Sequence, residues 1–272
     1  MKKTVLGVLL SSLIVFVVFV FPAYSQTEEG VEVKDAPRVD PDSLSELVES
    51  LEFLSKAGSF SFTAEVEYDA LQGNGERIEF GGVNKIAVVR PDKLHAEITE
   101  RDGTKKMFVF DGKDIYYADL EQNVYASVPR PGNINQAVDY FTEDLQMPLP
   151  LGQLISSDVS GMVKKEIYAG GFVEQSTING VLCDHLAFRT KNIDFQVWIA
   201  SEGDPLLMRL VIDYRSAPGE PQFRAMLKDW NFKPAVSDSL FVFKPGENMQ
   251  KIAFAPVLRA KIKTEEKEGE KK

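Results

Sequence analysis

The sequence of 272 residues has one cysteine, Cys183, and two histidines, His95 and His185. A single cysteine excludes an intramolecular disulfide, so the folded chain must depend on an apolar core. The sequence also lacks a nucleophile elbow, a phosphate-binding loop, a dinucleotide-binding glycine pattern and the HxxxH or CxxC spacings of metal ligands. We therefore expect no catalytic residue, no metal site and no cofactor.

Basic residues are too few and too scattered to form a cationic surface. Lys and Arg number 31 against 41 Asp and Glu, which gives a formal net charge of -10. This balance argues against nucleic acid as a partner and against simple electrostatic docking on anionic lipid. Beyond the N-terminus no apolar run is long enough to cross a bilayer, so we expect transient membrane contact at most.

The N-terminus has the pattern of a secretory signal peptide. Lys2 and Lys3 precede an apolar run over residues 5–21, and Ala23 and Ser25 are small residues at the positions that a signal peptidase reads. We predict cleavage after Ser25 and a periplasmic protein; the alternative is an uncleaved membrane anchor, since about 18 apolar residues approach spanning length. Cleavage would remove two lysines and lower the net charge from -10 to -12.

The rest of the chain divides into a flexible leader (26–39), one domain (40–256) and a charged, disordered tail (257–272), and we expect a monomer. The domain begins with an amphipathic helix that ends before Gly58. Its N-terminus offers several capping candidates, among which Ser43 and Glu46 have capping-box spacing. The apolar face of this helix consists of Leu44, Leu47, Val48, Leu51 and Leu54.

Most of the remaining domain is predicted to form an antiparallel sheet. Apolar residues alternate or run continuously between short turn-forming breaks, and the connections are too short for crossover helices. The predicted strands cover residues 60–68, 77–80, 84–90, 93–99, 105–110, 114–118, 124–127, 165–177, 181–189, 193–200, 206–214, 222–232, 240–243 and 250–254. We expect about eleven strands in the sheet, interrupted at 133–163 by helical segments that pack over it as a lid.

Both faces of the central meander, residues 179–214, look apolar. In the strand 206–214 one predicted face carries Leu206, Met208, Leu210, Ile212 and Tyr214. The other face carries Leu207 and Val211 among polar residues. A sheet with a strongly apolar face must cover that face, and what covers it is the functional question.

Cys183, Asp184 and His185 form the most chemically suggestive run of the sequence. In a strand, Cys183 and His185 share one face while Asp184 points to the other. We interpret Cys183 as a small buried apolar residue and His185 as a partly buried, hydrogen-bonded side chain. The alternative is half of a metal site or a Cys/His pair, which needs further ligands that the spacing does not supply.

Several segments together resemble a family of predicted bacterial periplasmic proteins whose domain has no known function. They are RPDKL (90–94), FDGK (110–113), YASVP (125–129), GVLCDHLAFR (180–189), DFQVWI (194–199) and DWN (229–231), within a similarity that spans about 44–254. That family is similar to the LolA and LolB lipoprotein carrier fold. The resemblance implies a half-open β-barrel, an α+β fold of mainly β structure, whose helices plug a cavity for acyl chains. The chain departs from the insertase because Gln26, and not a lipid-bearing cysteine, follows the predicted cleavage site.

The leading hypothesis is therefore a non-enzymatic carrier or chaperone for a lipid, a lipoprotein acyl chain or another amphiphile. The alternatives are a module with a filled core that binds another envelope protein and, third, a hydrolase or metal-dependent enzyme that uses His185. For the carrier, the candidate ligand-binding residues are Phe62, Val66, Phe195, Val197, Met208 and Leu210 on the sheet and Val138 and Phe141 on the lid. Periodicity does not separate such contacts from ordinary core residues.

Overall fold

A computed structural model describes residues 38–145 and 149–253, all within one compact unit, Pro37–Lys272. The predicted signal peptide, nearly all of the leader, and the tail lie outside the described residues, as do the last three residues of the predicted domain. Among the helices of the described residues, none combines the length and the hydropathy that a transmembrane span requires.

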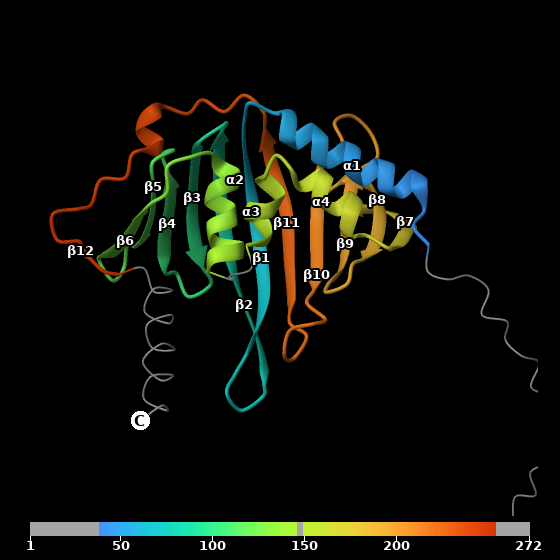
Figure 1. The fold of residues 1–272 in the computed structure, drawn as a ribbon, viewed down its shortest axis with the longest axis horizontal. Helices are drawn as coiled ribbons and strands as arrows, with labels where there is room; N and C mark the ends of the chain where they lie inside the picture. The colour runs from blue at the N-terminus through green and yellow to red at the C-terminus, as the bar shows by residue number, and fades with distance from the viewer. Residues whose placement is uncertain (1–37, 146–148, 254–272) are drawn as a thin grey trace, which may run out of the picture. The chain divides into compact units, whose positions relative to one another are not determined.

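The described chain is mainly β, with short helices grouped at its start and middle (Figure 1). In chain order the elements are α1 (Pro41–Lys56), β1 (Ser59–Leu71), β2 (Arg77–Val89), β3 (Lys93–Glu100), β4 (Lys105–Phe110), β5 (Asp114–Asp119), β6 (Val124–Pro129), α2 (Ile134–Asp139), the π-helix η1 (Tyr140–Asp144), α3 (Pro150–Ile155), α4 (Val159–Glu166), β7 (Ala169–Ile178), β8 (Val181–Arg189), β9 (Asp194–Ala200), β10 (Leu207–Asp213), β11 (Gln222–Asn231), the 3-10 helix η2 (Asp238–Phe241) and β12 (Gln250–Lys251).

All strands belong to one 12-stranded sheet in the order β12-β6-β5-β4-β3-β2-β1-β11-β10-β9-β8-β7. Every neighbouring pair is antiparallel except β12 and β6, which are parallel. The first and second halves of the chain meet where β1 pairs with β11, for example at Tyr68 and Phe223. Within the described residues β12 and β7 remain the two edges, so the sheet is not closed, which confirms the predicted fold class.

The helices lie against one face of this sheet (Figure 1), which we call the inner face. The reason is visible in β1, where Phe60, Phe62, Ala64 and Val66 are buried on alternate positions. Period-two alternation gives the strand one apolar side, and burial of that side requires a second layer. The apolar face of α1, with Leu47, Leu51 and Leu54 buried, supplies part of that layer.

Helix α1 begins three residues earlier than the predicted capping box implies. Asp40 is the N-cap, and its carboxylate accepts a hydrogen bond from the backbone N–H of Ser43 at 3.0 Å. Pro41 occupies the first helical position, where its missing N–H is no loss. Asp40 is thus the one of the several predicted capping candidates that caps the helix, and the capping-box spacing of Ser43 and Glu46 is not used.

Two strand predictions also needed correction. The break predicted between 80 and 84 does not exist, since β2 runs through Gly81 and Gly82. A Cβ on Gly82 would lie 2.3 Å from the backbone oxygen of Thr99. Glycine is therefore needed here because the two strands approach closely, and not because the chain turns. The segment 240–243 is not a strand: it overlaps η2, whose Phe241 is buried.

The helical interruption predicted at 133–163 is present as α2, η1, α3 and α4. Asn133 and Gln136 form a capping box at the start of α2. α4 continues to Glu166, so the first two residues of the predicted strand 165–177 belong to a helix. Val138, Phe141, Leu151 and Leu154 are buried from this segment.

Candidate ligand-binding site

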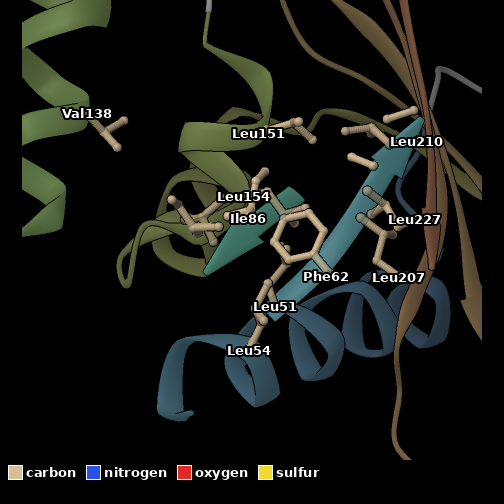
Figure 2. Close-up of a cluster of buried hydrophobic side chains, with 14 of the residues drawn as sticks. Leu51, Leu54, Phe62, Ile86, Val138, Leu151, Leu154, Leu207, Leu210 and Leu227 are labelled. Carbon is tan, nitrogen blue, oxygen red and sulfur yellow. The ribbon is translucent and has the colours of Figure 1, made fainter. Parts of the chain in front are cut away.

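An apolar layer fills the space between the inner face and the helices. Figure 2 shows Leu51 and Leu54 of α1, Leu151 and Leu154 of α3 and the sheet residues Phe62, Ile86, Leu207, Leu210 and Leu227 in this layer. Seven of the eight candidate residues are buried in it: Phe62, Val66, Val138, Phe141, Phe195, Val197 and Leu210. In this structure they are core residues, and their contact with a ligand stays a prediction.

The eighth candidate, Met208, lies on the opposite, outer face. There it packs with Cys183, Trp198, Ala200 and Val211. The register between β9 and β10 shifts between Leu207 and Arg209, so one extra residue sits in β10 and reverses the alternation. The prediction that Met208 shares a face with Leu210 is therefore wrong, and Leu207 takes the inner position.

A pocket of about 240 Å³, open to solvent, enters the apolar layer at one end of the sheet. It lies between α1, α3, the turn before β10 and the end of β11. Its lining residues are Ser50, Leu51, Phe53, Leu54, Leu154, Pro205, Leu206, Leu207, Trp230 and Phe232. None of these residues is among the candidate ligand contacts predicted from the sequence.

Two irregularities in the sheet build this pocket. The first is the extra residue in β10 that turns Leu207 inward. The second lies at the end of β11, where the register against β1 shifts between Ser61 and Thr63 and Asp229 has a positive φ of 56°. This shift brings Trp230 against Phe62, and its indole N–H donates to the backbone oxygen of Leu207 at 3.1 Å. Bulges commonly re-aim side chains at sites in this way.

Aromatic rings form the wall and rim of the pocket. Phe62 and Trp230 are stacked with ring centroids 4.5 Å apart, and Phe232 lies parallel to Trp230 at 5.9 Å. Phe53 of α1 meets Phe232 edge-on at 5.0 Å. Rings of this kind present large apolar surfaces that adapt little in shape, and they suit an aliphatic or aromatic ligand group.

Arg90 joins the helical layer to the sheet beside this cluster. From the end of β2 its guanidinium donates to the backbone oxygen of Ile155, at the end of α3, at 2.7 Å, and lies 3.5 Å from that of Leu54 in the last turn of α1. The guanidinium also lies 5.7 Å from the ring centroid of Phe60. Burial lowers the pKa of Arg90 below its ordinary value. This role of Arg90 was not predicted, because contacts with the backbone oxygens of distant helices leave no mark in a sequence.

On the outer face, Cys183 and His185 lie on the same side of β8, as predicted. Cys183 is fully buried. His185 stacks on Trp198 at a centroid distance of 4.0 Å, and its Nε2 lies 2.9 Å from Oε1 of Gln196. Arg209 lies over the same indole at 5.1 Å. These contacts are those of a packed, hydrogen-bonded histidine.

Comparison with family models matches residues 45–255 to the family described as "Predicted periplasmic protein (DUF2092)". That match covers most of the chain. No curated protein matches the sequence.

Solved structures show distant similarity only. Lipoprotein LppX of Mycobacterium tuberculosis is 16% identical with a TM-score of 0.47, over 73% of this chain and 100% of its own. LprF of Mycobacterium bovis is 14% identical with a TM-score of 0.47, over 74% and 97%. A LolA superfamily protein of Nitrosomonas europaea is 10% identical with a TM-score of 0.35, over 74% and 97%. At these scores the similarity says nothing about a ligand.

Proposed function

Because the chain belongs to the DUF2092 family of predicted periplasmic proteins, we propose that it is exported by a signal peptide cleaved after Ser25 and carries an amphiphile through the periplasm. The cargo class is a lipid, a lipoprotein acyl chain or another molecule with one long apolar part. No covalent chemistry is needed, and the driving force is the removal of apolar surface from water.

One observation carries the proposal: an aromatic-walled pocket leads from solvent into an apolar layer between the sheet and short helices. Its volume of about 240 Å³ includes open solvent. The enclosed part of the pocket is only about 10 Å³, whereas ligand sites for drug-sized molecules enclose roughly 300–1,000 Å³. A long acyl chain therefore enters only if the helices move away from the inner face, with the pocket as the point of entry.

The position of Arg90 supports such a movement. One side chain bonds to the ends of both α1 and α3, so its release removes one polar contact from each of the two helices. The acyl chain would then replace helix side chains against Phe62 and Leu210 on the sheet and would meet Val138 and Phe141 on the lid. In this exchange the sheet loses apolar contacts with the helices and gains apolar contacts with the acyl chain. The free energy difference between the closed and the ligand-bound state is therefore small compared with the free energy of burying the inner face.

The test is purification of the protein from the cell envelope, followed by lipid extraction and mass spectrometry. We expect the extract to contain about one amphiphile per protein molecule, and we expect a fluorescent fatty acid to displace that amphiphile from the protein. Leu206→Trp fills the mouth of the pocket and should weaken fatty acid binding at least tenfold. Leu120→Trp, at a leucine that is 38% exposed in the turn between β5 and β6, should leave it unchanged. A clean protein that binds no fatty acid would refute the carrier proposal.

A second candidate function is a protein-binding module whose core stays filled. The small pocket volume favours it, since the apolar layer is closely packed in the structure as it stands. Under this alternative, the addition of an amphiphile would not change the rates of amide hydrogen exchange in α2 and α3.

A further inference from the structure

The edge strand β7 exposes apolar side chains and unpaired backbone groups. Phe172 is 55% exposed and Val173 51% exposed, and Leu182 on the neighbouring strand is 45% exposed. Exposed, apolar sheet edges invite strand pairing, and proteins usually protect them. Among the described residues, β8 is the only strand that pairs with β7, and the one further contact on its free side is a bridge at Gly170.

The start of the same edge already pairs with a residue from another segment through a single β-bridge. Val39 forms a parallel bridge with Gly170: the backbone N–H of Gly170 donates to the oxygen of Arg38 at 3.1 Å, and that of Asp40 donates to the oxygen of Gly170 at 2.8 Å. The chain then turns away into α1 (Figure 1), so within residues 38–145 and 149–253 no strand covers the edge from Phe172 to Ile178.

Acidic side chains border this open edge. Asp184 lies opposite Gln175 in the ladder and accepts a hydrogen bond from its amide at 2.9 Å. Burial and the negative charges of Asp184 and Glu49 raise the pKa of Glu46 on α1 to about 7. On the outer face the Glu174 carboxylate is 63% exposed, 3.8 Å from Nδ1 of His185. In the described chain no Lys or Arg forms an ion pair with Glu46, Glu49 or Asp184.

We propose that the β7 edge from Phe172 to Ile178 binds an extended segment of another protein that carries both apolar and basic side chains. Strand addition would satisfy the backbone groups of β7 and cover Phe172 and Val173. A basic side chain of the partner would lie beside Glu174 on the outer face, and a long one would reach across β7 toward Asp184 on the inner face. This inference is independent of whether the chain carries an amphiphile.

Charge argues against a second copy of this chain as the occupant. Antiparallel pairing of two β7 edges about a twofold axis near Glu174 would bring the Glu174 carboxylates of the two copies together. Like charges across strands are destabilising. The formal net charge of -10 adds to the repulsion at longer range.

The probe is a synthetic eight-residue peptide with the repeat Val-Val-Lys-Lys. Because strand side chains alternate between faces, this repeat presents both valine and lysine on each face. A Val-Val-Glu-Glu peptide is the matched control, and a backbone N-methylated lysine peptide tests ladder hydrogen bonds. Affinity is measured by fluorescence anisotropy, and the site by amide hydrogen exchange of the purified protein.

We expect the lysine peptide to bind at least tenfold more tightly than the glutamate and N-methylated peptides, and to slow exchange in β7 but not in β6. Phe172→Ser should weaken binding about tenfold. The matched Phe80→Ser, at a phenylalanine that is 45% exposed on β2, should change it less than twofold. Asp184→Asn tests charge alone and should also weaken binding. Failure of both peptides to bind, equal binding of both, protection elsewhere, or equal effects of the two serine variants would overturn the proposal.

Discussion

At the scale of single residues, Arg90 has the most specific role in the account. Its bond to the oxygen of Ile155 is charge-assisted and partly buried. Loss of such a hydrogen bond costs about 1.5–3 kcal/mol of the free energy of unfolding. We predict that Arg90→Met lowers stability by this amount, measured by urea denaturation, and speeds amide exchange at the ends of α1 and α3.

The matched control for Arg90 is Arg101→Met. Arg101 forms exposed ion pairs with Glu67 and Glu79 on the outer face, and pairs of this kind contribute little to stability. If the two substitutions reduce stability equally, or if exchange in α3 is unchanged in Arg90→Met, Arg90 does not hold the helices as we infer.

Glu46 gives stability a pH dependence of known sign. Its pKa is raised from 4.5 to about 7, first by burial and then by Asp184 and Glu49. The folded state therefore holds this proton more tightly than the unfolded state, and stability falls as pH rises from about 4.5 through about 7. We predict that Glu46→Gln stabilises the protein at pH 8 and has little effect at pH 4.5.

Thermal unfolding at both pH values measures this difference. Glu121→Gln, in the exposed turn between β5 and β6, is the control and should show no comparable change between the two pH values. A Glu46→Gln variant with equal effects at pH 4.5 and pH 8 would contradict the assignment of the raised pKa to this carboxyl group.

Residue faces were predictable only where strands are regular. The alternation in β1 correctly places Phe62 and Val66 on the inner face. At the start of β10, Leu206, Leu207 and Met208 are all apolar, so the sequence does not show which of them face inward. The extra residue in β10 places Met208 on the outer face. Trp230 was not predicted as a pocket residue for a related reason. The irregularity at Asp229 turns Trp230 toward the pocket, and no pattern of apolar residues in the sequence reveals it.

At the scale of secondary structure elements, the helical layer is the part expected to move. α2 and α3 have six residues each. Helices of fewer than about 12 residues are marginal in water without tertiary contacts. We predict by hydrogen exchange that amides of α2 and α3 exchange faster than those of β1 and β11 in the free protein, and that a bound fatty acid changes exchange in the helices alone. Equal protection of helices and central strands would contradict a separately moving layer.

Element positions followed from the sequence where turn residues and periodicity agree. β4 and β8 match their predicted ranges, and the helical interruption falls within a few residues of 133–163. The errors occurred where a local pattern has two interpretations. Gly81 and Gly82 indicated a break but allow close strand approach, and the apolar segment 240–243 packs through η2 and not through a ladder.

At the scale of the whole molecule, the antiparallel sheet was predictable but its strand order was not. Neighbouring strands pair along the chain because short turns leave no alternative. The central pairing of β1 with β11 joins residues such as Val66 and Ala225, which no local pattern links. The pocket lies at this junction, which explains why its lining residues could not be predicted.

The most direct test of the central claim is the affinity of the purified protein for saturated fatty acids of increasing chain length. Displacement of a fluorescent fatty acid measures it. Burial of one methylene contributes about 0.8 kcal/mol, so affinity should rise about fourfold for each added methylene until the chain exceeds the space under the helices. The carrier account predicts this rise. Affinity that does not depend on chain length, or no displacement at any length, would contradict it.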